Sequence, residues 1–213
     1  MMLVGICADW LKGVEIMVTK ENQLLGGMEN NPRGRILAAA AHLFQKKGFE
    51  RATVRDLAQA VGIQSGSIFH HFKTKEDILR NVMVEVIKFN TDRMQGALEQ
   101  ANTVHDKVLA LVKSELQSIN GDTGEAMTVL IYEWRSLKPE SQQEILVLRQ
   151  VYEQMWLDVF EEAKEEGLIA PDADTFILRR FITGALGWSN FWYKPDGKLD
   201  ISALAEKSLS LIL

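Results

Sequence analysis

Apolar residues recur along most of this chain at spacings of three and four, the period of an amphipathic helix. After residue 30, for example, Ile36, Ala40, Leu43 and Phe44 form one apolar stripe. Gly48 follows the stripe and is expected to end that helix. No segment shows the strict alternation of a half-buried strand. The pattern predicts an all-α protein with about nine helices.

Several of these helices are preceded by a short polar side chain with an acid three residues later. Thr53 with Asp56 and Thr74 with Asp77 have this capping-box spacing. Similar pairs stand at residues 103 and 106 and at residues 122 and 125. Further helices are expected at residues 54–61, at 65–72, from 74 to 98, from 103, from 122, at 139–166, at 172–193 and at 201–212.

The chain divides into three parts on this pattern. Residues 1–30 have weak periodicity and are expected to be a poorly packed leader. Residues 31–81 form a small helical module, and residues 82–213 form a larger helical body. No stretch approaches the roughly 20 apolar residues needed to span a membrane, and Cys7 is the single cysteine. We therefore expect a cytoplasmic protein without a disulfide framework.

The stretch GIQSGSIFHHFKTKED, residues 62–77, follows the short helix at 54–61 after a tight turn. Ile68 and Phe72 lie four residues apart and should face inward, as should Leu57, Ala58 and Val61 of the preceding helix. The other face then carries short polar side chains and two imidazoles, which can approach a DNA groove and donate to phosphates and base edges. This is a helix-turn-helix arrangement, although an ordinary surface helix with a solvated polar face fits the same pattern.

The charge distribution is compatible with DNA binding but does not decide between these two interpretations. The whole chain has a net charge of −5, but residues 28–81 hold nine Lys and Arg against five Asp and Glu. Residues 82–213 hold thirteen basic residues against twenty-one acidic ones. A basic module on an acidic body is expected when only one end of a protein meets a polyanion.

Other kinds of site find little support. His70 and His71 are adjacent, so on a helix they point about 100° apart and cannot easily chelate one ion. No glycine-rich loop follows a strand, and no nucleophile and base form a recognisable set. We expect no metal, no cofactor and no enzymatic activity.

The stretch RGRILAAAAHLFQKKGFERATVRDLAQAVGIQSGSIFHHFKTKEDILRNV resembles, over about 50 residues, the DNA-binding region of the TetR family of transcriptional regulators. The resemblance implies a DNA-reading helix with Arg55 near the groove and with Lys75 gripping a phosphate. Two positions depart from the family: Phe69 stands where Tyr is usual, and Gln64 where Ser or Thr is common, so Gln64 or Ser65 is expected to cap the reading helix. The implied DNA-binding residues are Thr53, Arg55, Gln64, Ser65, Gly66, Ser67, Phe69, His70, His71 and Lys75.

The resemblance also gives the body a function. TetR-like proteins hold a ligand between their middle helices and dimerise through their last two helices, which here would be residues 172–193 and 201–212. The C-terminal segments resemble a subgroup that often responds to acyl-CoA thioesters. The implied ligand-binding residues are Met127, Leu130, Ile131, Trp134, Arg135, Leu148, Tyr152, Met155 and Trp156. Core packing is nevertheless the favoured explanation for most of the aromatic residues, and a surface ion pair is the favoured role for Arg135 and for Arg149.

The sequence therefore predicts a homodimeric, DNA-binding transcriptional regulator, most simply a repressor released by a small hydrophobic or acyl-CoA-like effector. The alternative is a structural DNA-binding protein of the same fold that acts without a ligand. A chamber in the body would favour the regulator, and a filled body would favour the alternative.

Overall fold

A computed structural model describes Met28 and residues 30–213 of the chain. The leader predicted for residues 1–30 lies, apart from Met28 and Asn30, outside the described residues. Nine α-helices and two short 3-10 helices make up the described part, with no strand among them. The all-α prediction is confirmed.

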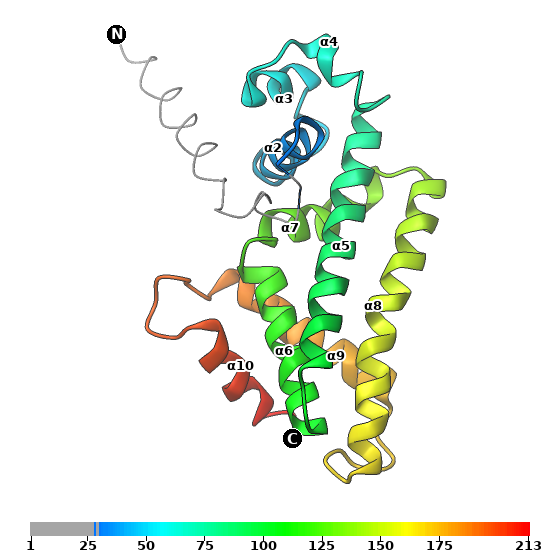
Figure 1. The fold of residues 1–213 in the computed structure, drawn as a ribbon, viewed down its shortest axis with the longest axis vertical. Helices are drawn as coiled ribbons and strands as arrows, with labels where there is room; N and C mark the ends of the chain where they lie inside the picture. The colour runs from blue at the N-terminus through cyan, green and yellow to red at the C-terminus, as the bar shows by residue number, and fades with distance from the viewer. Residues whose placement is uncertain (1–27, 29) are drawn as a thin grey trace. The chain divides into compact units, whose positions relative to one another are not determined.

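The helices follow one another with short connections (Figure 1). Their bounds are α2 Pro32–Lys47, α3 Val54–Val61, α4 Ser65–Ile68, α5 Lys75–Glu99, α6 Val104–Asn120, α7 Gly124–Tyr132, η1 Trp134–Ser136, α8 Pro139–Glu165, α9 Thr175–Gly187, η2 Trp188–Phe191 and α10 Ile201–Leu209.

Helix ends form where local chemistry satisfies the free backbone groups. Thr53 and Asp56 make both hydrogen bonds of a capping box at the start of α3, and Thr103 caps α6 through the Asp106 N–H. Gly48 ends α2 with a φ of 80°, a left-handed conformation that only glycine adopts without strain. These predicted boundaries are confirmed.

Several boundaries differ from those predicted, among them the end of α10, which lies at Leu209 rather than at residue 212. The reading helix was expected over residues 65–72, but α4 ends at Ile68 and the chain continues in tight turns to Phe72. Helix α9 begins at Thr175 because Asp174, rather than a residue near 172, accepts a hydrogen bond from the Ile177 N–H. It ends at Gly187, where η2 takes over.

The chain folds into two compact units. Among the described residues, unit 1 comprises Met28 and residues 30–86 and 125–145, and unit 2 comprises residues 87–124 and 146–213. The first part of helix α5 belongs to unit 1 and the rest belongs to unit 2, and the same is true of helix α8. Helices α2, α3 and α4 therefore share a compact unit with η1 and nearly all of α7.

In unit 1, α2 packs on α3 and α3 packs on α4 (Figure 1). Phe44 and Phe49 meet edge to face with ring centroids 5.3 Å apart. In unit 2, α6 is central and packs against α9, η2 and α10. The core of unit 2 includes Trp156 and Phe160, whose ring centroids lie 5.5 Å apart. Within the described part of the chain, no helix is long and apolar enough to cross a bilayer.

Candidate DNA-reading surface and effector region

The helix-turn-helix is built by two backbone features and two buried side chains. The capping box starts α3, and Gly62 ends it with a φ of 71°, which turns the chain toward α4. Ile68 and Phe72 are buried, as the sequence predicted. Leu57 and Ala58 of α3 are also buried, so α4 is held by packing on its apolar side while its polar side stays outside.

Most of the predicted DNA-binding residues gather on that outer side. Gln64, Gly66, His70 and His71 are exposed, and Ser65 and Ser67 are partly exposed. Phe69 is 54% exposed, which is high for an aromatic ring and leaves it free to contact a DNA groove. Thr53 and Arg55 are exposed at the start of α3. The structure thus brings together a polar surface that extends from the first turn of α3 to His71.

The predicted cap of the reading helix is wrong. Gln64 occupies the N-cap position of α4, but its side chain makes no capping hydrogen bond. Its backbone carbonyl instead accepts from the Ser67 N–H at 2.9 Å. A four-residue helix without a side-chain cap depends on tertiary packing for its position.

Lys75 is placed differently from the other members of the set. Its Nζ lies 2.7 Å from the carbonyl oxygen of Phe49 and 3.0 Å from that of Ala52. The ammonium therefore donates to the turn between α2 and α3 within unit 1. The sequence carried no signal for this contact, because its acceptors are backbone atoms.

The predicted ligand-binding residues are divided between the two units. Unit 1 holds Met127, Leu130 and Ile131 of α7 and Trp134 and Arg135 of η1. Unit 2 holds Leu148, Tyr152, Met155 and Trp156 of α8. Trp156 is fully buried in the core of unit 2, whereas Ile131 is largely exposed. Arg149 pairs with Glu153 at 3.6 Å, which is the ion-pair alternative left open for it.

A buried polar cluster in unit 2 surrounds one of these candidates. The Tyr152 hydroxyl donates to Oε2 of Glu115 at 2.6 Å. Arg179, whose side chain is 8% exposed, lies with Nη2 3.2 Å from Oε2 of Glu153. The sequence analysis missed Glu115 and Arg179, although an acid and an arginine on the apolar faces of their helices were a usable signal.

Burial governs the protonation of this cluster. Desolvation raises the pKa of the Glu115 carboxyl above its ordinary value, although the Tyr152 hydroxyl and the Arg179 charge act in the opposite direction. The pKa of Tyr152 is raised well above its ordinary value, first by desolvation and then by the neighbouring Glu115. Both groups are therefore biased toward their neutral forms.

Four buried nitrogen atoms of unit 2 have no hydrogen-bond acceptor among the described residues. They are Nδ2 of Asn90, Nε of Arg93, Nε1 of Trp156 and Nε of Arg179. Buried donors are normally paired, and each one left unpaired costs free energy. Unit 2 thus has a surplus of buried hydrogen-bond donors.

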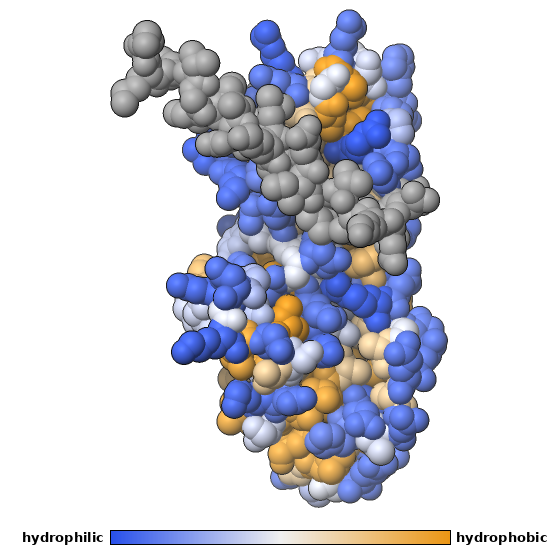
Figure 2. Space-filling model, turned by 60° about the vertical axis from the view of Figure 1, so that its left-hand side comes forward, coloured by the Kyte–Doolittle hydropathy of each residue, from blue (hydrophilic) through white to orange (hydrophobic). Residues whose placement is uncertain are grey.

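The last helices carry an exposed aromatic patch, which we define as Phe176, Phe181, Trp188, Phe191 and Trp192. Each of these side chains is at least 46% exposed, and Phe181 reaches 76%. Figure 2 shows hydrophobic surface in the lower part of the molecule, on the side where α10 lies. The rings of Trp188 and Phe191 lie with their centroids 4.5 Å apart, and exposed apolar side chains gathered in this way are typical of interaction sites.

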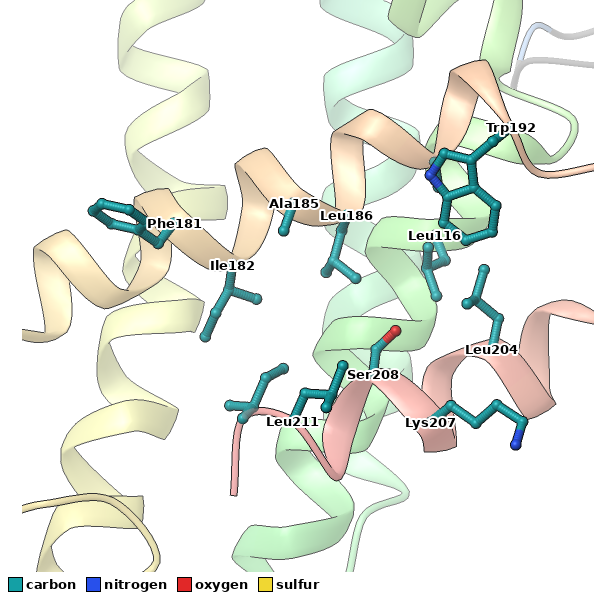
Figure 3. Close-up of a pocket in the computed structure, with 12 residues that line it drawn as sticks. Leu116, Phe181, Ile182, Ala185, Leu186, Trp192, Leu204, Lys207, Ser208 and Leu211 are labelled. Carbon is teal, nitrogen blue, oxygen red and sulfur yellow. The ribbon is translucent and has the colours of Figure 1, made fainter.

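A cleft of about 490 Å³ lies between α6, α9 and α10, next to the aromatic patch. Ile182 and Leu186 of α9 line one side of it, and Leu204 of α10 and the following Leu211 line the other (Figure 3). Leu186 is only 6% exposed and belongs to the core of unit 2. Helix α9 and the following η2 segment therefore combine a buried side within unit 2 with an exposed aromatic side, whereas α10 carries no aromatic residue.

An exposed polar helix in a helix-turn-helix, with only helices in the described part of the chain, is typical of a DNA-binding transcriptional regulator. Residues 36–82 match the family model described as "Bacterial regulatory proteins, tetR family". Residues 101–213 match the model described as "Tetracyclin repressor-like, C-terminal domain". The chain belongs to the TetR family of transcriptional regulators.

Three known proteins show how far the similarity extends. The transcriptional repressor KstR2 of Mycolicibacterium smegmatis is 31% identical over 184 residues, covering 85% of this chain and 88% of that protein. The crystal structure of the superantigen PfiT is 59% identical, with a TM-score of 0.73, and covers 84% of this chain and 94% of that one. The structure of FadR from Bacillus subtilis in complex with stearoyl-CoA is 25% identical, with a TM-score of 0.68, and covers 83% of this chain and 95% of that one.

Proposed function

We propose that this protein is a homodimeric repressor that leaves its operator DNA when a small apolar or acyl-CoA-like ligand binds its helical body. The observation that carries the proposal is the exposed polar face of residues 64–71, held over the buried side chains of Ile68 and Phe72. Support for repression comes from relatives named as repressors, such as KstR2.

Two observations support the proposed class of ligand: the ligand bound by a relative, and the side chains in the helical body of this chain. FadR of B. subtilis binds stearoyl-CoA, which combines a long apolar chain with a thioester carbonyl. Helix α8 carries Tyr152 together with apolar side chains of the unit 2 core. Unit 2 also has buried nitrogen atoms without hydrogen-bond acceptors. A ligand with an apolar chain and oxygen acceptors would satisfy such donors.

A DNA-binding test separates this proposal from general affinity for polyanions. We would select duplexes from a random pool with the full-length protein and measure affinity across salt concentrations. Phosphate contacts should make log affinity fall by about 0.9 per phosphate neutralised as log salt rises. A protein that selects no sequence, or whose affinity does not change with salt, is not the proposed repressor.

Ligand response is tested on the selected duplex. Acyl-CoA thioesters of increasing chain length are added, and DNA release is followed by fluorescence anisotropy. A coupling of about 5–150-fold in DNA affinity is typical of such linkage. If no acyl-CoA changes the affinity, the alternative of a ligand-independent structural DNA-binding protein is favoured.

Dimerisation is assigned to α9 and α10 and is tested on the aromatic patch. Phe181→Glu places a charge on the most exposed ring of the patch, whereas a change at the buried Leu186 would disturb the core of unit 2 itself. We expect Phe181→Glu to give monomers in sedimentation experiments. The matched control is Val151→Glu, which alters an exposed apolar residue of α8 and should remain dimeric. A dimeric Phe181→Glu protein would place the interface elsewhere.

A second candidate function rests on the 59% identity with the superantigen PfiT. We propose that the chain shares the activity for which PfiT is named. The test is T-cell proliferation with purified full-length protein, compared with a superantigen standard. Absence of stimulation at the standard's working concentration would reject this function and leave the regulator proposal intact.

A further inference from the structure

The turn between α2 and α3, residues 48–52, is held on one side by Lys75. The Nζ atom lies over the Phe49 ring, 4.2 Å from its centroid. An ammonium group has three hydrogens, and three carbonyl oxygens surround this one. The Nζ–oxygen distances are 2.7 Å to Phe49, 3.0 Å to Ala52 and 3.3 Å to Glu50. The donors of Lys75 are therefore used within unit 1.

Glu133 holds the same turn from another element. Its Oε1 accepts the Phe49 N–H at 2.9 Å, and its Oε2 accepts the Ser136 hydroxyl at 3.0 Å. The adjacent Gly48 has a φ of 80°, and a β-carbon there would stand 3.5 Å from Oε1 of Glu133. Because Glu133 immediately precedes η1, its carboxylate connects the α7–η1 segment to the turn.

The position of this turn determines where the DNA-reading elements begin. Ala52 is fully buried and Phe49 is nearly so, and the next residue, Thr53, is the N-cap of α3. Helix α3 in turn packs against α4. A displacement of residues 49–52 would therefore move the cap of α3 and, through α3, the reading helix.

We propose that Lys75 and Glu133 are positioning residues for operator binding, which fix the 48–52 turn, and that Glu133 links this turn to the α7–η1 segment. Lys75 then acts through the turn rather than through the phosphate contact that the sequence suggested. Trp134 and Arg135, two of the predicted ligand-binding residues, directly follow Glu133, so a shift of η1 is transmitted to the Phe49 N–H. This inference rests on the proposed binding of operator DNA.

A phosphate contact by Lys75 and positioning of the 48–52 turn by Lys75 predict different effects of salt on DNA affinity. A lysine that neutralises a phosphate contributes about 0.9 to the slope of log affinity against log salt, and its removal flattens the slope by about one. A positioning lysine lowers the population of the binding-competent conformation, which lowers affinity without changing the slope. If the variant without this lysine holds the native conformation of the turn about one-tenth of the time, its affinity for DNA falls about tenfold.

The Lys75 experiment uses the full-length protein with Lys75→Met. We expect DNA affinity to fall about tenfold, the salt slope to stay at its wild-type value, and amide hydrogen exchange to accelerate at residues 49–53 in the free protein. The comparison variant is Lys73→Met, which removes an exposed lysine two residues away and should leave that exchange unchanged. A flattened slope with wild-type exchange in Lys75→Met would overturn the positioning role.

Glu133 is tested with a pair of variants that differ in one property. Glu133→Gln keeps an oxygen that can accept the Phe49 N–H, and Glu133→Met does not. We expect faster exchange of the Phe49 amide and weaker DNA binding in Glu133→Met, with both restored in Glu133→Gln. Equal behaviour of the two variants would refute the link.

These readouts separate this inference from the proposed function. Exchange of residues 49–53 is measured without DNA, so wild-type exchange in both Lys75→Met and Glu133→Met refutes the inference even when the wild-type protein binds its operator normally. Failure of the wild-type protein to select any duplex refutes the proposed function instead.

Discussion

Replacing Arg179 with methionine should strongly destabilise unit 2. Its side chain is 8% exposed and lies 3.2 Å from Glu153, and its charge also acts on the buried Glu115. Methionine fills much of the space of the arginine stem but removes the buried cation, which leaves only the more exposed Arg149 near these two carboxyl groups. Removing one partner of a buried pair costs about 3–5 kcal/mol.

Thermal unfolding gives a direct measurement of this cost. For a chain of this size, 1 kcal/mol shifts the melting temperature by about 2–4 °C, so a loss of about 3 kcal/mol corresponds to roughly 6–12 °C. The matched control is Arg149→Met, because Arg149 approaches the same Glu153 with a side chain that is 46% exposed. An exposed pair contributes about 0–1 kcal/mol, so the control should melt within about 4 °C of the wild type.

A double variant tests the cause of the loss. Glu115→Gln removes the buried carboxyl that Arg179 stabilises, so the loss caused by Arg179→Met should be smaller in this background. Coupling of about 0.5–3 kcal/mol is typical of residues in one polar network. Equal melting temperatures for Arg179→Met and Arg149→Met, or strict additivity in the double variant, would refute this account of the cluster.

Two further predictions concern stability. Gly62→Ala should cost about 1–2 kcal/mol in urea unfolding, because the residue has a φ of 71° while no atom within 4 Å would obstruct the new β-carbon; an unchanged midpoint would contradict this. Glu115→Gln should change the pH profile, since burial raises the pKa of Glu115 in the folded protein. At Glu115 the native state then binds more protons than the unfolded state, so the contribution of this group to wild-type stability should fall as pH rises above about 4.3. The Gln variant should lack that fall in urea titrations, and parallel profiles would show that Glu115 does not titrate as described.

The sequence predicted what depends on local chemistry. The pairing of Thr53 with Asp56 spans three residues, so its spacing was sufficient to locate the start of α3. The burial of Ile68 and Phe72 agrees with their spacing of four, although Phe72 lies in the turns that follow α4. Most of the outer face of α4 could be predicted for the same reason, because a helix with one buried side exposes the other.

The contacts of Lys75 and Glu133 could not be predicted in this way. Their partners are the carbonyls and the N–H of a turn, and backbone atoms leave no signature in the sequence. Glu115 and Tyr152 are 37 residues apart, and only the packing of two helices brings them together. Periodicity also does not distinguish a side buried in its own unit, such as that of Leu186, from one left exposed, such as that of Phe181.

The way α4 is held has a consequence for how such proteins diverge. Helix α4 is positioned by Ile68 and Phe72, whereas the outer side chains of Ser65, Ser67 and His70 contribute little to holding it. Substitutions on the outer face can therefore change the preferred operator at little cost in stability. Gene duplication followed by a few such changes would give a new regulator that ignores the old operator while keeping the same scaffold.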